Sequence, residues 1–225
     1  MVCYLARSGD GIERYAETEW DLLDMPVATM SRQAEYADPD QVHPSALGEN
    51  VSRLEQGYWV KPESLPKKVL WANGTKPIPD VLPRFVVSPR FRDLVEQFEP
   101  GVHQFVPVEI YKSRDGESAA IYYWFIIGQR VCSVDEEHTT YIFKAFSDQP
   151  EDGYWSKRKR NRELQRYEDI PGAQLFFSNS RTDGHHIWKD PQLLTGGERL
   201  CSDSFADAVT AGNYTGVNVS KRATV

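Results

Sequence analysis

Two distant stretches of this sequence repeat one pattern, and the repeat limits what the chain can fold into. They are VVSPRFRDLVEQFEPGVHQF at 86–105 and LCSDSFADAVTAGNYTGVNV at 200–219. The aligned positions are Ser88 with Ser202, Phe91 with Phe205, Asp93 with Asp207, Val95 with Val209 and, with one residue of slack, Gly101-Val102 with Gly216-Val217. A chance likeness between two ordinary amphipathic helices is the alternative explanation.

Each copy predicts a helix that begins at a serine. In the first copy, Phe91, Leu94, Val95 and Phe98 have the spacing of one helix face, and Ser88 is a favourable N-cap. A Pro-Gly pair ends this helix, a Gly-Asn pair ends the second, and a strand-like run follows each. Both copies therefore predict a strand, a Ser-capped helix and a strand. The residues assigned to this structural motif are Ser88, Phe91, Ser202, Phe205 and Gly216.

The best-patterned strands lie between the two copies. VHQFVPVEIY and SAAIYYWFIIG flank KSRDGE, whose Asp-Gly pair predicts a hairpin, and Pro107 places the first run at a sheet edge or a bulge. A strand is also expected at 2–6, and the apolar spacing over 12–23 predicts an amphipathic helix. The predicted fold class is α+β: a mixed, largely antiparallel sheet built on the strands of 102–146, with helices packed on it and an internal strand–helix–strand repeat.

Length, hydrophobic content and cysteine usage favour a cytoplasmic globular protein. The 225 residues, 40% of them hydrophobic, allow one large domain or two small ones. No apolar run is long enough to span a membrane, and the first residues do not have the pattern of a signal peptide. Three widely spaced cysteines form no disulfide framework. We divide the chain into an acidic N-terminal region, 1–78, packed on a main α+β domain, 79–225.

The net charge of −7 is confined to the first fifth of the chain, because residues 1–50 hold ten acidic and three basic side chains. A solvated acidic face is one explanation, and a surface that attracts a basic partner is the other. The basic run KRKRNRELQR at 157–166 is interpreted as a solvated helix or loop that is compensated by its acidic flanks. We therefore expect no nucleic-acid binding.

The sequence contains no convincing catalytic or metal-binding constellation. His185 and His186 are adjacent, so on a strand they point to opposite faces and cannot easily share one metal ion. The run DEEH at 135–138 offers three carboxylates and an imidazole, but acid/base work would need two of them held apart in a cleft, and a surface loop is the better explanation. We expect neither a cofactor nor enzymatic activity.

Four blocks of the chain resemble one bacterial family. They are PDVLPRFVVSPRFRDLVEQFEPGVHQFVPVEIY, YYWFIIGQRVCSVDEEHT, LFFSNSRTDGHHIWKD and RLCSDSFADAVTAGNYTGVNV. They are similar to immunity-protein family eleven of the polymorphic-toxin systems, over about 79–225, whereas 1–78 fits this pattern poorly. The matching residues are Val87, Ser88, Phe91, Leu94, Pro107, Val108, Tyr122, Asp135, Gly184, His186, Ser202, Asp207, Gly216 and Val217.

The resemblance implies a protein that binds and neutralises a cognate toxin, and it implies no catalytic residue. The acidic N-terminal charge suggests that the toxin is basic where it binds. The candidate toxin-binding residues are Glu13, Glu17, Glu19, Asp21, Asp24, Asp135, Glu136, Glu137 and Trp155. Two alternatives remain: a small-molecule or carbohydrate-binding module that uses tryptophan and tyrosine rings, and a hydrolase or transferase that uses the carboxylates of 135–138 with His186. The sequence carries no signal for the oligomeric state.

Overall fold

The computed structural model describes residues 1–7, 19–24, 59–72, 76–145, 153–161, 166–193 and 199–225. Within these ranges the fold is α+β, as predicted, but the strands form two main sheets rather than one. Sheet A has the order β11-β12-β1-β13, and sheet B has the order β2-β3-β5-β6-β4. Their neighbouring strands are antiparallel except for β3 and β5, which run parallel.

The bounds of the elements are as follows. Sheet A contains β1 (Val2–Arg7), β11 (Ile187–Trp188), β12 (Arg199–Ser202) and β13 (Val217–Lys221). Sheet B contains β2 (Glu19–Leu22), β3 (Lys68–Ala72), β4 (Val86–Val87), β5 (Gln104–Tyr111) and β6 (Ser118–Ile126). Two short hairpins are formed by β7 (Ile142–Ala145) with β8 (Gly153–Ser156) and by β9 (Arg158–Asn161) with β10 (Arg166–Asp169). The helices are α2 (Pro89–Phe98), α3 (Asn179–Thr182) and α4 (Asp203–Ala211), with 3₁₀ turns at Pro62–Ser64 and Pro83–Phe85.

Both copies of the sequence repeat form the predicted unit. In the first copy β4 leads into α2 and then β5, and in the second β12 leads into α4 and then β13. Ser88 Oγ accepts the N–H of Phe91 at 3.1 Å, and Ser202 Oγ accepts the N–H of Phe205 at 3.2 Å. Each serine thus satisfies one of the free N–H groups at the start of its helix. The prediction of two Ser-capped units is confirmed.

Strand pairing shows that the two copies are equivalent units. In each, the strands before and after the helix are parallel to each other and enclose one antiparallel strand. That central strand is β6 in the first unit and β1, from the start of the chain, in the second. The registers also agree: Trp124 pairs with Val86 and Val106, and Tyr4 pairs with Leu200 and Ser220, so the two partners of the central strand are equally far apart in the sequence in both units.

The equivalence extends to the segment that precedes each unit. Val81 pairs with Val87 in the first unit as Ile187 pairs with Cys201 in the second. The residues just before them, Asp80 and His186, hold the two capping serines. The contacts are Asp80 O with the N–H of Ser88 at 2.8 Å, His186 O with the N–H of Ser202 at 3.0 Å, Asp80 Oδ1 with Ser88 Oγ at 2.8 Å and His186 Nδ1 with Ser202 Oγ at 2.9 Å. The repeat is therefore a four-stranded unit with one helix.

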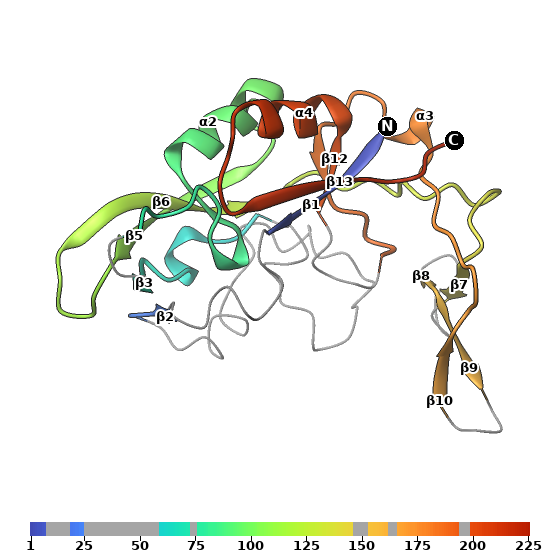
Figure 1. The fold of residues 1–225 in the computed structure, drawn as a ribbon, viewed down its shortest axis with the longest axis horizontal. Helices are drawn as coiled ribbons and strands as arrows, with labels where there is room; N and C mark the ends of the chain where they lie inside the picture. Colours follow the sequence, from blue (N-terminus) through green and yellow to red (C-terminus); the bar gives the residue numbers. More distant parts are fainter. Residues whose placement is uncertain (8–18, 25–58, 73–75, 146–152, 162–165, 194–198) are drawn as a thin grey trace.

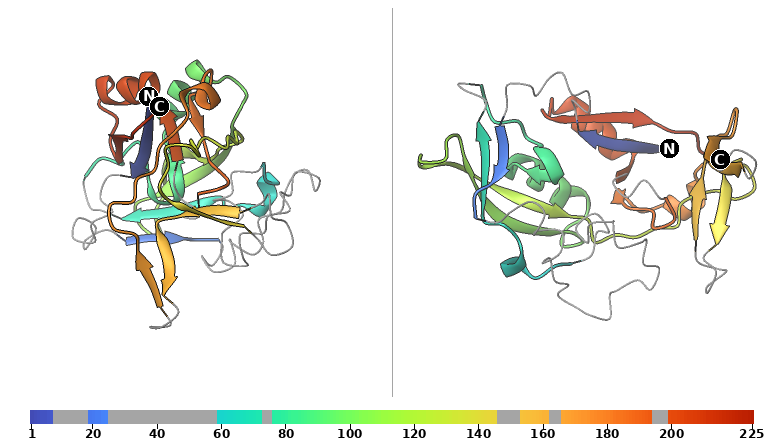
Figure 2. Two further views of the ribbon diagram at one scale, coloured as in Figure 1. Left: turned by 90° about the vertical axis from the view of Figure 1, so that its right-hand side faces the viewer. Right: turned by 90° about the horizontal axis from the view of Figure 1, so that it is seen from below.

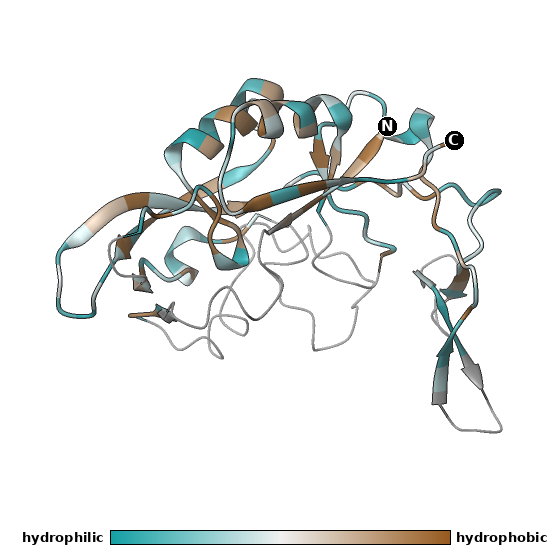
Figure 3. Cartoon of the chain, in the orientation of Figure 1, coloured by the Kyte–Doolittle hydropathy of each residue, from teal (hydrophilic) through white to brown (hydrophobic). Residues whose placement is uncertain are grey.

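The two units bury one shared core between them. Figure 1 shows α2 and α4 together in one layer above the strands, and Figure 3 shows hydrophobic residues on the strands beneath them. Phe91 and Phe205, which occupy the same position of the repeat, are fully buried and contact each other edge to face at 6.2 Å between ring centroids. Phe98 also meets Phe205, and Arg90 donates to the carbonyl of Gly212 at the other end. The helices are thus antiparallel, as a pseudo-twofold relation between the units requires.

A buried carboxylate at the end of α2 joins the two units. Glu99 Oε1 accepts the N–H of His186 at 2.8 Å, and Oε2 accepts the N–H of Ile187 at 3.0 Å and a hydrogen bond from His103 Nε2 at 2.7 Å. Because His103 Nδ1 accepts the N–H of Gly128, Nε2 carries the proton that His103 donates to Glu99. Burial raises the pKa of Glu99, but these hydrogen bonds outweigh it and hold the pKa below its ordinary value.

A second contact joins the two units at the place that corresponds to the Glu99 contact, but it is made by different side chains. Asp80 Oδ2 accepts the N–H of Thr215 at 2.9 Å and its hydroxyl at 3.0 Å, and the N–H of Val81 bonds to the carbonyl of Thr215 at 3.0 Å. In both contacts, the segment that follows one unit's helix binds the residues that precede the other unit's helix. The pseudo-twofold relation therefore also holds for the connections, although the side chains differ.

Two expectations for secondary structure are wrong within the described residues. The segment predicted as a helix over 12–23 ends as strand β2, antiparallel to β3, with Trp20 opposite Trp71; its residues 12–18 lie outside the described ranges. Alternation in the strand buries Leu22 on the core of sheet B. The basic run is not a helix or loop, because its described residues after Lys157 lie on β9 and β10, a hairpin that projects from the body (Figures 1 and 2). Its expected acidic compensation is present: Arg158 contacts Asp169 at 2.9 Å.

We predict that alanine has unequal effects at the two repeat glycines. Gly101 has φ +70° in open space, whereas Gly216 has φ +81° and a Cβ there would lie 2.1 Å from the carbonyl oxygen of Val81. Gly101→Ala should lower the free energy of unfolding by about 1–2 kcal/mol, the cost of the left-handed conformation. Gly216→Ala should cost about 1–3 kcal/mol more, because the methyl group clashes. Urea denaturation checks this, and equal losses would contradict the packing at Gly216.

We further predict that Glu99→Gln destabilises the protein in a pH-dependent way. At pH 7 the free energy of unfolding should fall by about 2 kcal/mol, since an amide replaces a carboxylate that accepts three hydrogen bonds. Because the folded pKa of Glu99 is lowered, its contribution is present above the ordinary value of 4.5 and is lost as the pH falls through the folded value. The difference between wild type and variant should therefore shrink in acid. Denaturation at several pH values checks this, with exposed Glu117→Gln as the control; a constant difference would contradict it.

Candidate functional site

The candidate site lies over the outer face of sheet A, opposite α4. There a cluster of buried residues is covered by the segments around 131–140 and 173–178. Its members are Val2, Val131, Val134, Phe177, Trp188, Leu193 and Leu200, with Trp155 packed against them. Val134 pairs with Phe177, and the N–H of Ser178 bonds to the carbonyl of Ser133 at 2.9 Å. These contacts hold the segments around 131–140 and 173–178 in place over the apolar cluster.

The acidic run 135–138 forms a turn that is bonded to the neighbouring chain. Asp135 Oδ1 accepts the N–H of His138 at 2.9 Å and contacts His138 Nδ1 at 2.7 Å, and the N–H of Asp135 bonds to the carbonyl of Phe176. The hydrogen bonds from His138 hold the pKa of Asp135 below its ordinary value. The Thr139 hydroxyl accepts the N–H of Phe176 at 3.0 Å. Asp135 therefore shapes the turn.

Glu136 and Glu137 are the acidic side chains of this turn that face solvent. Glu136 contacts Arg181 of α3 at 3.4 Å, and Arg181 also donates to the carbonyl of Val134 at 3.0 Å. Glu137 is exposed, and its carboxylate forms no contact with a described residue. An exposed ion pair such as Glu136–Arg181 contributes little to stability, so both carboxylates are available to a partner.

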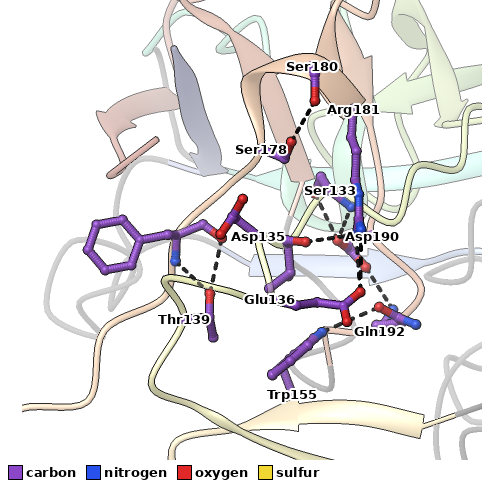
Figure 4. Close-up of polar contacts among 12 residues, drawn as sticks. Ser133, Asp135, Glu136, Thr139, Trp155, Ser178, Ser180, Arg181, Asp190 and Gln192 are labelled. Atoms are coloured by element: carbon purple, nitrogen blue, oxygen red, sulfur yellow. Dashed lines mark hydrogen bonds and ion pairs between the residues drawn. The ribbon is translucent and has the colours of Figure 1, made fainter. Parts of the chain in front are cut away.

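A buried carboxylate, Asp190, connects the turn to Trp155 (Figure 4). Asp190 Oδ2 accepts the N–H of Ser133 at 2.6 Å and its hydroxyl at 2.8 Å, and Oδ1 accepts the N–H of Gln192 at 2.8 Å. Gln192 in turn accepts a hydrogen bond from the indole N–H of Trp155 at 3.3 Å. Burial raises the pKa of Asp190, and the hydrogen bonds from Ser133 oppose that rise. This chain of contacts fixes the half-buried Trp155 beside the acidic turn.

The structure does not bring all the predicted toxin-binding residues together. Asp135, Glu136, Glu137 and Trp155 belong to the site just described. Asp21 and Asp24 lie beside sheet B, where Asp21 contacts Arg114 at 2.9 Å and Asp24 accepts the N–H of Lys67 at 2.8 Å. The Arg114 hydrogen bond lowers the pKa of Asp21. Glu13 and Glu17 lie outside the described residues, as does the side chain of Glu19.

His186 contacts residues of the repeat and not those of the acidic turn. Its Nδ1 contacts Ser202, its N–H donates to Glu99, and its ring meets Phe98. Within the described ranges, no hydrogen bond or ion pair joins His186 to the carboxylates of 135–138, and no group of three or more metal-ligating side chains occurs. Burial raises the pKa of the Cys201 thiol, which suits a core residue rather than a nucleophile.

The tryptophans do not form one stacking surface. Trp71, Trp124 and Trp188 are core residues, Trp20 and Trp155 are half-buried, and Trp59 is the exposed member, at 40%. Rings that fill cores cannot stack on a ligand. The aromatic density that suggested a binding module is therefore used mainly for packing.

Sequence reasoning missed several residues of the site, among them Ser133, Arg181, Asp190 and Gln192. In the sequence, Asp190 stands out only as an acid four residues after His186, and the Asp-Pro pair at 190–191 indicates a turn but not its partner. Its contact with Ser133 joins positions far apart in the chain. No local pattern encodes such a pairing, so only the folded structure could identify it.

One known protein family matches this chain. The chain matches the model of the immunity protein family (Imm11) over residues 2–224. Because this match spans nearly the whole chain, the protein belongs to that family, and the resemblance is confirmed. The match also includes the first 78 residues, which we expected to fit the shared pattern poorly. A search of curated proteins finds no match. Within the described ranges, no helix is long and apolar enough to cross a membrane.

We predict that Ser133→Ala weakens the support of the site. Removing the hydroxyl leaves buried Asp190 with one hydrogen bond fewer, so the free energy of unfolding should fall by about 1–2 kcal/mol, and the pKa of Asp190 should rise further. Denaturation and carboxyl NMR titration measure the two effects. Ser180→Ala, at an exposed serine in the same region, is the control and should change stability by less than about 0.5 kcal/mol. Equal effects of the two variants would contradict the role of Ser133.

Proposed function

We propose that this protein binds a cognate toxin and neutralises it by protein–protein contact, so that the cell that makes the toxin is protected. The observation that carries the proposal is the match to the immunity protein family over residues 2–224. Binding rather than turnover is the mode of action, and it requires a surface that is complementary to the toxin in shape and charge.

Two acidic surfaces are the proposed contacts with the toxin. One is the N-terminal group Glu13, Glu17, Glu19, Asp21 and Asp24, and the other is Asp135, Glu136 and Glu137 with Trp155. The internal contacts of Asp21, Asp24 and Asp135 support a role for these three in shaping the surface and its field. Glu136 and Glu137 are exposed, and Trp155 provides a rigid aromatic contact beside them.

The acidic charge favours a toxin that is basic at its binding surface, for example a nuclease. Opposite charges on two proteins accelerate their encounter, and this acceleration declines as salt screens the charges. The inhibitor would then cover the positively charged surface that the toxin uses on its own target. Neutralisation by occlusion requires no catalytic residue.

The test of the proposal is co-expression with the product of the adjacent gene, followed by calorimetry of the purified pair at two salt concentrations. Restored growth and nanomolar binding that weakens as salt rises are the expected results. Tight binding that is indifferent to salt would keep the immunity function and remove the acidic steering. No binding and no rescue would reject the function for that partner.

We predict that charge reversal separates the two acidic surfaces. Glu13→Lys, Glu17→Lys and Glu19→Lys together, or Glu136→Lys with Glu137→Lys, should weaken toxin binding by about tenfold or more and reduce its salt dependence. Asp21 and Asp24 are left unchanged because they hold internal contacts. Glu117→Lys, at an exposed acid on the β5–β6 hairpin, is the control. A loss of affinity in the control equal to that of the variants would mean that only total charge matters.

A further inference from the structure

A cavity of about 460 Å³ opens beside β5 in sheet B. Its walls come from the segment before β3, from β5 and from β6; the residues are Pro62, Glu63, Lys67, Val106, Pro107, Val108, Glu109 and Ile121. This volume lies in the range of about 300–1,000 Å³ that is typical of binding pockets. No predicted toxin-binding residue lines it.

The cavity exists because β3 pairs with only part of β5. The pairing starts at Lys68 opposite Glu109, and the N–H of Glu109 bonds to the carbonyl of Lys67 at 2.8 Å. Alternate residues of a strand direct their backbone groups to the same side, so residue 107 also faces this edge. Pro107 has no N–H and cannot extend the pairing. β5 is not an edge strand, as one reading of Pro107 predicted, because it lies between β3 and β6. Only its first half, which includes Pro107, has no register with β3, and the cavity lies at this gap.

The chemistry of the cavity suits a cationic side chain with an apolar stem. Val106 and Val108 are buried in the sheet, while Pro107 and Ile121 are exposed, Ile121 at 46%. The backbone at Pro107 offers a carbonyl oxygen and no donor. Glu63, Glu109 and Lys67 are among the residues that line the cavity, and Glu109 Oε2 accepts a hydrogen bond from the hydroxyl of Tyr111. Hydrogen-bond acceptors and negative charge thus exceed donors and positive charge at its rim.

Of the two N-terminal acids Asp21 and Asp24, Asp24 contacts a residue of the cavity. Asp24 accepts the N–H of Lys67, a cavity residue, and Asp21 contacts Arg114 in the hairpin that joins β5 to β6. The negative charge of Asp24 therefore lies next to a residue of the cavity. A basic partner would be attracted to this charge before it makes close contact.

We propose that the cavity receives an arginine side chain of the cognate toxin, an inference that rests on the proposed function. The guanidinium group would pair with Glu63 and with the carboxylate of Glu109, and the methylene groups would lie on the exposed side chains of Pro107 and Ile121. Arginine fits better than lysine because its planar group binds carboxylates with two hydrogen bonds and is less strongly hydrated. The cavity then forms the central contact, and the acidic N-terminal region steers the approach.

Calorimetry of the full chain with the product of the adjacent toxin gene is the first test. Glu63→Gln should weaken binding about tenfold, and Ile121→Asp should weaken it by more, because both change the cavity alone. Glu117→Gln and Ile142→Asp are matched controls, an exposed acid at the hairpin tip and an isoleucine of similar exposure, at 41%, on β7. If the wild type binds and all four variants bind within twofold of it, the cavity proposal is overturned and the immunity function stands.

NMR titration with a small ligand tests the cavity independently of the toxin. N-acetyl-arginine amide at millimolar concentration should shift the methyl signal of Ile121, and Glu63→Gln should reduce the shift. N-acetyl-citrulline amide, a neutral ligand of nearly the same shape, is the control and should shift it several times less. Equal shifts with both ligands, or none with arginine, would overturn the proposal whatever the toxin does. Absent toxin binding with a specific arginine shift would instead reject only the immunity function for that partner.

Discussion

The arrangement of this protein depends on a carboxylate that is buried between its two repeated units. Glu99 accepts hydrogen bonds from His103 and from the backbone N–H groups of His186 and Ile187, so its charge is satisfied inside the protein. Removing any of these donors would leave the buried carboxylate without one of its hydrogen bonds. The resulting loss in the free energy of unfolding would be larger than the contribution of an ordinary hydrogen bond. The contact fixes the end of α2 against the start of β11, and this sets how the two helices pack.

The pseudo-twofold relation explains what is scaffold and what is added to it. Each unit has four strand segments, one capped helix and one face buried under the helices. In sheet B, strands β2 and β3 extend the unit along β5, and the cavity lies where this extension begins. In sheet A, the segments around 131–140 and 173–178 cover the outer face and carry the acidic turn. The acidic turn is therefore built on an addition to the repeat, whereas the cavity lies between an addition, the segment before β3, and strands β5 and β6 of the repeat itself.

The sequence predicts local structure well and long-range pairing poorly. Serine caps, the helix stops and the Asp-Gly hairpin depend on neighbouring residues, and all are present. The insertion of β1 between β12 and β13 joins the two ends of the chain, and no local pattern encodes it. Helical spacing at 12–23 was misleading because the pairing of Trp20 with Trp71 determines that Glu19–Leu22 is a strand. Of the site, the exposed acids could be predicted, but the buried support from Asp190 could not.

Exposed residues of such a protein can change its choice of partner without disturbing the buried contact between the units. Specificity is a difference between affinities, and it changes most readily where a substitution does not disturb the core. Glu63, Ile121, Glu136 and Glu137 are exposed, whereas Phe91, Phe205 and Glu99 are buried in the contact between units. The two surfaces lie on different sheets, and the described N-terminal acids are tied to the hairpin and to Lys67 at the cavity. Under the proposed function, the charge of Asp24 beside Lys67 would favour the approach of a basic toxin at the cavity.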